Sequence, residues 1–321
     1  MTERNDGRFV RAASLARIGR FLLARLVGGA LAFVLLSAVI FVLARASGDP
    51  LILLLPPEAT ALQIETLRHS LSLDEPLPVQ YVSFLRNAAQ GDFGQSLRDR
   101  RPALRSVVDR LPATASLAVI ALTLAVVIAV PLGVAAAYHK DTSIDLVAKT
   151  IALLGQSAPA FWLGLVLIQL FSVNWQIFPV AGMGSPAHFV LPAVTLGWFS
   201  VAALMRVLRS SMIDVLDSEY VKFLRSQGFS ERFILWKHCL RNALIPVLSV
   251  SGLLFAIFLT GTVVVETVFA WPGVGRLTYE AIIARDFPVI QAVILFTAGL
   301  VFAVNMGIDL LYLAVDPRLR A

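Results

Sequence analysis

Long stretches without a charged side chain constrain this chain more than any other feature of its sequence. No Asp, Glu, Lys or Arg occurs in the intervals 26–44, 111–138, 242–265 and 287–308, each of which fits one helix, and a fifth interval, 150–205, fits two. A bilayer core about 30 Å thick is crossed by about 20 apolar residues, and one charge at the centre of a span costs about 2.5–3.5 kcal/mol. The spacing therefore predicts an all-α integral membrane protein with six transmembrane helices.

Composition supports this prediction. Apolar residues make up 58% of the 321 positions and charged residues 15%, against about 45–50% and 25% in soluble domains. The alternative, buried helices of a large soluble core, does not account for five clean intervals. Uncharged turn-forming residues interrupt the interval 150–205 and predict an outer turn between the third and fourth spans: Asn174, Pro179, Gly182, Gly184 and Pro186.

The distribution of basic residues predicts the topology. The tail before the first span, residues 1–20, holds five arginines and only two acids, so the positive-inside rule places it in the cytoplasm. Six spans then return the C-terminus to the same, cytoplasmic side. Further basic residues agree with this orientation, namely Lys140, Lys149, Arg318 and Arg320.

Residues 47–112 form a large outer loop in this topology, and residues 21–321 form a single transmembrane domain. Seven arginines in the loop are offset by eight acids, and loops longer than about 60 residues largely escape the charge rule. Proline and glycine punctuation with a polar helical stretch over 60–70 predicts a small folded excursion. Ala44–Ala46 resembles a signal-peptidase site, but the preceding apolar run exceeds the about 7–15 residues of a signal peptide. We therefore expect an uncleaved first span.

A polar segment, residues 214–246, separates the fourth and fifth spans. Its apolar residues recur near helical spacing on either side of Gly228, which predicts two short amphipathic helices joined by a glycine with positive φ. Ser230 is the expected N-cap of the second helix, with Glu231 in its first turn, and Pro246 is expected to end it. The pattern leaves two interpretations open, a rigid elbow that transmits force and a hairpin lying on the lipid surface.

A family resemblance favours the elbow. Residues 219–221, Gly228 and residues 241–246 resemble the EAA signature of ATP-binding-cassette (ABC) importer permeases. Leu224 departs from this pattern, which usually has a small residue there, and Ser72 stands where the outer loop often has glycine. Other blocks, in order along the chain, resemble the dipeptide/oligopeptide/nickel branch of that family: Gly48–Pro50, Leu73–Leu77 with Gln80 and Tyr81, Gly91–Ser96, Pro159–Trp162, Glu266–Gly275, Arg285–Pro288 and Asp316–Arg318.

The resemblance implies a multi-pass permease subunit of the bacterial inner membrane that transports peptides or a similar small solute. It implies as partners a second homologous permease subunit, two ABC ATPase subunits and a periplasmic or extracellular substrate-binding protein. ATP and Mg²⁺ would bind to the ATPases, so this chain would not be an enzyme. The elbow would be the coupling helix seated in an ATPase cleft, through Glu219, Tyr220, Gly228, Ser230, Glu231, Arg241, Asn242 and Pro246.

The chain is not expected to bind a nucleotide, a metal or a nucleic acid. It contains no G-x-x-x-x-G-K-[ST] sequence that could cradle phosphates as a P-loop does. Membrane-flanking arginines explain the basic balance without nucleic acid. Four scattered histidines and one cysteine offer no metal-ligand spacing, namely His69, His139, His188, His238 and Cys239.

Three residues are candidates for a pathway or gate: Glu266, Trp271 and Asp309. Asp309 lies in the last apolar segment, four residues after Asn305 and so on the same helical face. Acids inside membranes face the bundle interior and pair with other groups, so a purely structural bond is the alternative. Glycines in membrane spans are more often helix-packing positions than ligand contacts, and four glycines are interpreted in this way: Gly28, Gly29, Gly133 and Gly164.

Two other functional classes remain as rivals. A secondary transporter working alone would need charges near mid-depth of its spans, and the clean intervals offer almost none. An intramembrane protease would need a serine and a histidine at matched depth, and no histidine falls within an expected span. The ATP-driven importer is the favoured hypothesis.

Overall fold

The computed structural model describes residues 3–46, 60–70, 74–260 and 262–315, and over these residues the chain is helical without a strand. The nearest approach to a sheet in this part is an isolated bridge between Gln95 and Pro102. The chain forms two compact units, one made of residues 1–109 and 280–321 and the other of residues 110–279. Each unit is described separately below.

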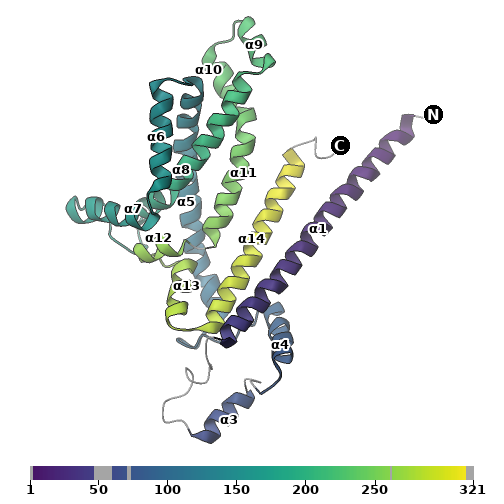
Figure 1. The fold of residues 1–321 in the computed structure, drawn as a ribbon, viewed down its shortest axis with the longest axis vertical. Coiled ribbons are helices and arrows are strands. Elements are labelled where there is room, and N and C mark those ends of the chain that lie inside the picture. The colour runs from purple at the N-terminus through teal and green to yellow at the C-terminus, as the bar shows by residue number, and fades with distance from the viewer. Residues whose placement is uncertain (1–2, 47–59, 71–73, 261, 316–321) are drawn as a thin grey trace. The chain divides into compact units, whose positions relative to one another are not determined.

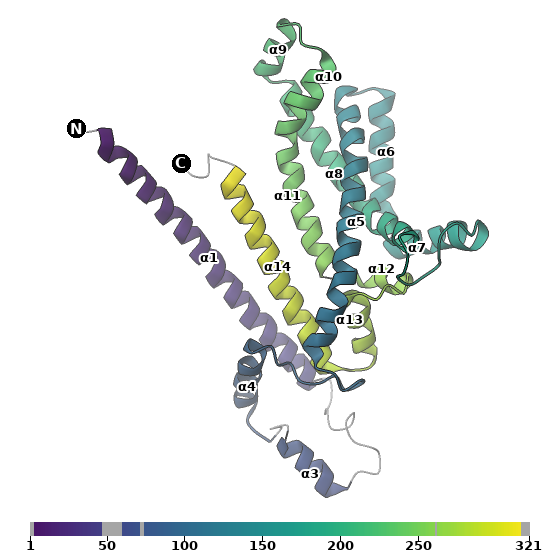
Figure 2. The same cartoon turned by 180° about the vertical axis from the view of Figure 1, so that it is seen from behind.

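Four long helices stand side by side in the second unit (Figures 1 and 2). Small residues let them approach closely: a Cβ on Gly197 of α8 would lie 3.0 Å from the carbonyl oxygen of Ala121 on α5. Such close backbone approach drives helix association in lipid, where the hydrophobic effect between helices is absent. The four helices are α5 (Ala103–Tyr138), α6 (Ser143–Ser157), α8 (Ala187–Leu216) and α11 (Leu240–Leu259).

Short elements gather at the two ends of this bundle (Figure 1). One end carries α9 (Glu219–Ser226), α10 (Glu231–Phe233) and the π-helical segment η2 (Ile234–Cys239). Towards the other end lie α7 (Ala160–Leu167), the π-helical segment η1 (Ile168–Asn174), α12 (Val263–Val268) and α13 (Val274–Ile283).

In the first unit, α1 (Glu3–Ala46) lies beside α14 (Phe287–Val315). Arg25 and Asp309 join the two helices, with Nε 2.9 Å from Oδ2. The tail predicted for residues 1–20 is helical from Glu3 and continues into the first span. The loop that follows holds α3 (Ala61–Ser70) and α4 (Leu77–Ala89), and Tyr81 of α4 meets Phe41 of α1 at 5.4 Å between ring centroids.

The predicted helical spans are present with one correction. Five helices are long and apolar enough to cross a membrane, and the third predicted span is a pair, residues 143–157 and 160–174, bent by 101°. Pro159 explains the break, because a proline forces its predecessor out of the helical region, and Ala158 has φ −86° and ψ 125°. The third span also begins earlier than expected, so that Asp145 and Lys149 lie within α6.

The outer loop also differs in part from its prediction. The helix expected over 60–70 is present, and Thr60 begins it with a capping box: Thr60 N donates to Gln63 Oε1 at 2.9 Å and Gln63 N donates to Thr60 Oγ1 at 3.3 Å. The loop was predicted to reach residue 112, but α5 already begins at Ala103. Several predicted features lie outside the described residues, namely Gly48–Pro50, Ser72, Leu73 and Asp316–Arg318, with Arg320.

A buried carboxylate joins α6 to α8. Asp145 accepts hydrogen bonds from Arg209 Nε at 2.6 Å and Arg209 Nη2 at 2.7 Å. Lys149 Nζ lies 2.8 Å from the same carboxylate, and Asp141 N donates to it at 3.0 Å. The Asp145 side chain is 1% exposed and that of Arg209 18%, so this bidentate pair is shielded from water and strong.

Breaking this pair should destabilise the second unit. We expect Asp145→Ala to lower the free energy of unfolding by about 3–5 kcal/mol, because it leaves the Arg209 guanidinium without its buried partner. Thermal unfolding of the purified protein in detergent measures the effect. Asp145→Ala with Arg209→Ala should cost clearly less than the sum of the single changes.

Glu219→Ala is the matched control, because Glu219 and Lys222 form a solvent-exposed pair and such pairs contribute little. If the single changes at Asp145 and Arg209 had additive effects, or if the control lost as much stability, the assignment of a strong buried ion pair would be contradicted.

Candidate functional site

The segment of residues 214–246, called the elbow here, folds back on itself at Gly228. Gly228 has φ +79°, as predicted, and its N donates to Arg225 O at 3.0 Å. Across the turn, Arg225 Nε and Nη2 donate to the Glu231 carboxylate at 2.9 and 3.3 Å. This contact raises the pKa of the Arg225 guanidinium. The turn is therefore closed by backbone and side-chain bonds together.

The elbow is anchored in the core of the second unit. Val221 of α9 and Ile234 of η2 are fully buried, and both belong to the cluster that contains Leu208 and Met212 of α8. Leu224, the departure from the family pattern, packs against the same cluster. A large side chain at this position is therefore accommodated within the chain itself.

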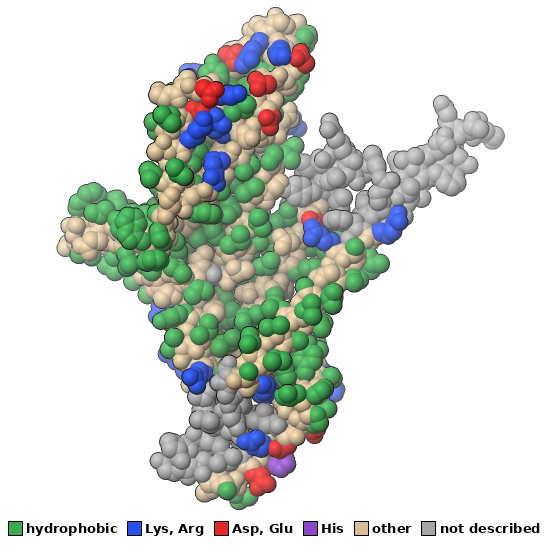
Figure 3. Space-filling model, in the orientation of Figure 1, with side chains coloured by type: hydrophobic (Ala, Val, Ile, Leu, Met, Phe, Trp, Pro, Cys, Tyr) green, Lys and Arg blue, Asp and Glu red, His purple; other side chains and the backbone are tan. Residues whose placement is uncertain are grey.

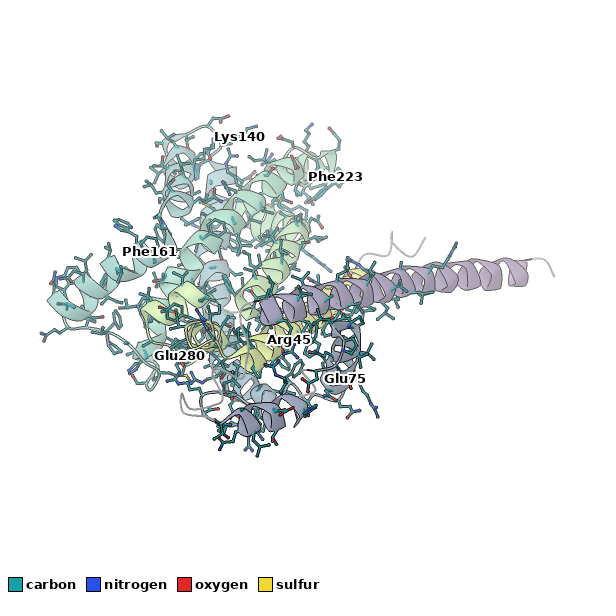
Figure 4. The ribbon with its side chains drawn as sticks, turned by 60° about the horizontal axis from the view of Figure 1, so that its bottom comes forward. Arg45, Glu75, Lys140, Phe161, Phe223 and Glu280 are labelled. Carbon is teal, nitrogen blue, oxygen red and sulfur yellow. The ribbon has the colours of Figure 1, made fainter. Side chains whose placement is uncertain are left out.

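The opposite face of the elbow is exposed. Phe223 is 62% exposed, and the side chain of Glu219 is 88% exposed. Tyr220 accepts a hydrogen bond from Asn242 Nδ2 at 3.1 Å, which joins α9 to α11. Charged side chains gather at this end of the unit (Figure 3), and Phe223 is labelled on it in Figure 4. An anchored inner face and an exposed, mixed apolar and charged outer face suit a protein contact.

One expectation about the elbow was confirmed in position and another was wrong. Ser230 occupies the N-cap position of α10 but makes no capping side-chain hydrogen bond. Pro246 does not end the second helix, which runs without interruption from Glu231 to Leu259. The proline removes only one backbone donor, and the helix continues as the fifth span. The second helix of the elbow is thus a direct extension of that span.

At the other end of the bundle, the Glu266 turn (residues 262–276) surrounds a buried carboxylate. Glu266 was expected at the end of the fifth span but lies in a separate helix, α12. Its side chain is fully buried, and it accepts hydrogen bonds from Thr114 Oγ1 at 2.8 Å and Arg276 N at 3.0 Å. Thr114 Oγ1 accepts in turn from Val274 N at 2.8 Å. The carboxylate therefore satisfies amides at the start of α13 and ties that start to α5.

Trp271 and Gly273 complete this turn. The fully buried Trp271 donates from Nε1 to Ala113 O at 2.9 Å. A Cβ on Gly273 would overlap the Glu266 carboxylate, so only glycine fits beside it. Both predicted gate residues, Glu266 and Trp271, thus lie together in one bonded turn.

The remaining candidates lie in the first unit. The Asp309 side chain is 17% exposed and forms an ion pair with Arg25. This agrees with the alternative that Asp309 makes a structural bond. Asp286 accepts from Ser96 Oγ at 2.5 Å, which brings together two blocks that the sequence only placed in order, Gly91–Ser96 and Arg285–Pro288.

Sequence reasoning missed Thr114, Asp145 and Asp286, because their partners are 64 to 190 positions away along the chain. For Asp145 and Asp286 the available signal was an acid in a very apolar chain, a signal that does not extend to Thr114. In the part of the chain that is described, no group of three or more His, Cys, Asp or Glu could hold a metal ion.

The Glu266 turn predicts a sharp difference between two glycine substitutions. Gly273→Ala should lower the free energy of unfolding by about 1–3 kcal/mol, since the added methyl displaces the carboxylate. Gly299→Ala, where the added methyl has no atom within 4 Å, should change it little. Thermal unfolding in detergent compares the two, and equal melting temperatures would contradict the assigned role of Glu266.

Comparisons with known proteins agree with these features. Residues 129–321 match the family described as the binding-protein-dependent transport system inner membrane component, and residues 18–118 match its N-terminal family. The glutathione transport system permease protein GsiC of Escherichia coli (strain K12) is 40% identical over 301 residues, 94% of this chain and 98% of the relative. The GsiC protein of Salmonella choleraesuis (strain SC-B67) is 39% identical with the same coverage.

A solved structure shares the fold. A chain of the MetNI methionine ABC transporter, in an inward-facing conformation, superposes with a TM-score of 0.57 at 17% identity, covering 65% of this chain and 96% of that chain. The family models and the GsiC relatives confirm the resemblance to ABC permeases across nearly the whole sequence. This chain belongs to the family of binding-protein-dependent transport system inner membrane components, and it is a multi-pass permease subunit of an ABC importer.

Proposed function

We propose that the chain is one of two homologous permease subunits that line a pathway, and that the elbow couples it to one of two separate ATPase subunits. ATP and Mg²⁺ bind to the ATPases, and a substrate-binding protein delivers the solute from outside. The observation that carries this proposal is the elbow itself. It has a core-anchored inner face, an exposed outer face with Phe223 and Glu219, and a continuous helical connection into the fifth span.

The continuous helical connection supports a gating mechanism. Movement of the elbow would be carried by the uninterrupted helix of residues 231–259 towards the Glu266 turn. Closure of the ATPases would thus switch the spans between inward-open and outward-open arrangements, as in other two-state transitions. This mechanism requires the elbow to lie in the cytoplasm. With six spans, a cytoplasmic elbow places both termini there too, in agreement with the basic residues of the tail.

The substrate proposed is a peptide-sized solute. The curated relatives named above are glutathione permeases, and the sequence blocks resemble the dipeptide and oligopeptide branch. Glutathione and dipeptides, each added as a competitor in an uptake assay of the complete transporter in proteoliposomes, would identify the substrate class.

The elbow turn predicts a coupling defect. Gly228→Val should abolish ATP-driven uptake and retention of the ATPase, because a β-branched residue at φ +79° forces the turn to rearrange. Co-purification of the ATPase with the permease, together with uptake in proteoliposomes, measures both effects.

Gly182→Val is the matched control. Gly182 also has a positive φ, +89°, and open space around it, but it lies at the far end of the bundle. The control should retain the ATPase. Retention by both variants, or a wild-type chain that never retains an ATPase, would refute the coupling proposal and favour a transporter working alone.

A further inference from the structure

In the first unit, α1 and α14 run side by side (Figures 1 and 2), and a groove of about 440 Å³ lies between the end of α1 and the start of α14. Apolar side chains line most of it, among them Ile40, Leu43, Ile282 and Ile290. Arg285 is the one charged side chain of this lining. We call this cavity the α1–α14 groove. Its chemistry is therefore apolar with a single positive charge.

The groove lies at one boundary of the hydrocarbon region. Ile40 and Leu43 fall in the last turns of the charge-free interval 26–44, and Ile290 lies in the first turn of the charge-free interval 287–308. Arg285 comes two positions before the second interval, so its guanidinium is placed at headgroup level, where the basic side chains of membrane proteins gather. The apolar lining thus lies at the depth of acyl chains, and the cation lies at the depth of lipid phosphates.

A defined turn fixes the position of Arg285, which has φ +53°. Arg285 N donates to Ile282 O at 3.1 Å, and Asp286 N donates to Ala281 O at 2.8 Å. These two bonds form a Schellman motif at the end of α13, and glycine is the usual residue at its left-handed position. Any side chain there carries a conformational cost. The turn would be better served by glycine, so the arginine is explained by what its side chain faces, the groove.

A second groove, of about 370 Å³, follows on the same stripe of α1. Apolar side chains and glycines make up its whole lining, which includes Gly29, Phe33 and Leu36 of α1 and Phe302 of α14. Positions 29, 33, 36, 40 and 43 of α1 recur at spacings of three and four, so they share one helical face. The two grooves together therefore offer a long apolar path with a cation at one end.

A crevice of this kind fits a hydrocarbon chain and not a further helix. α1 and α14 are already in contact within the stripe, where the Phe302 ring lies against Gly29. A helix with its side chains needs about 10–12 Å of width, whereas an acyl chain is one methylene wide. Water does not fill apolar cavities. A phospholipid combines the chain that suits the two grooves with the phosphate that suits Arg285.

We propose that the α1–α14 groove binds an anionic phospholipid, with its phosphate on Arg285 and one acyl chain along the stripe of α1. A guanidinium pairs with phosphate oxygens through two parallel hydrogen bonds, and basic pockets between transmembrane helices hold anionic headgroups. In the topology proposed above, this lipid belongs to the outer leaflet. It holds α1 against α14 at the end opposite the pair of Arg25 and Asp309.

Selective fluorescence quenching tests this proposal. Leu43→Cys in the groove and Val42→Cys, a similarly exposed neighbour outside it (54% and 59%), are made with Cys239→Ser and cysteine-free partner subunits and labelled with bimane. The complete transporter is reconstituted in phosphatidylcholine vesicles with a small fraction of brominated phosphatidylglycerol. We expect stronger quenching at position 43 than at 42, and equal quenching by brominated phosphatidylcholine. Equal quenching by the brominated phosphatidylglycerol, no quenching at position 43, or displacement by inorganic phosphate overturns the proposal.

A pair of glycine variants gives an independent readout. Arg285→Gly removes the cation and suits the left-handed turn, so its melting temperature should be no lower than that of the wild type. Native mass spectrometry of the complete transporter, titrated with phosphatidylglycerol, should show an apparent affinity about fivefold lower. Arg100→Gly is the matched control, because Arg100 is also exposed and left-handed, with φ +59°, and lies outside the groove. Equal affinities of the two variants overturn the proposal.

Discussion

The exclusion of uncompensated charge from a low-dielectric interior governs this structure. Asp145, Glu266 and Asp309 are acids in helical or turn segments of a very apolar chain, and each is held by donors from an element distant in sequence. An unpaired carboxylate in such surroundings would be very costly, so these positions fix which helices meet. Asp145 joins α6 to α8, Glu266 joins the start of α13 to α5, and Asp309 joins α14 to α1.

Between these polar links, small residues do the packing. The close approach at Gly197 and Ala121 lets α8 and α5 meet along their backbones, and Gly133 and Gly164 lie against Leu208 and Phe269 in the same way. Apolar area alone gives little preference between helices in lipid, so shape decides their arrangement. The packing glycine expected at position 28 has no atom near its missing Cβ, whereas Gly29 beside it faces Phe302.

The transport mechanism proposed here depends on a division between rigid and broken helices. Helix formation continues unbroken through Pro246, so the second helix of the elbow and the fifth span form one continuous helix. At Pro159 the helix is broken, because two successive residues, Ala158 and Pro159, take extended conformations. One proline is accommodated within a helix whose inner face, at Ala243 and Val247, is buried, and the other marks the bend at which α7 turns away from α6.

The sequence by itself determined the membrane class, the positions of the apolar spans, the glycine turn at Gly228 and the family. These follow from local properties, namely charge spacing, backbone freedom and short motifs. Only the tertiary structure decided that Thr114 serves Glu266, that Ser96 serves Asp286, and that the third span bends away from the bundle. Such contacts join residues far apart in the chain, and no local pattern specifies which of many possible partners a buried polar group will meet.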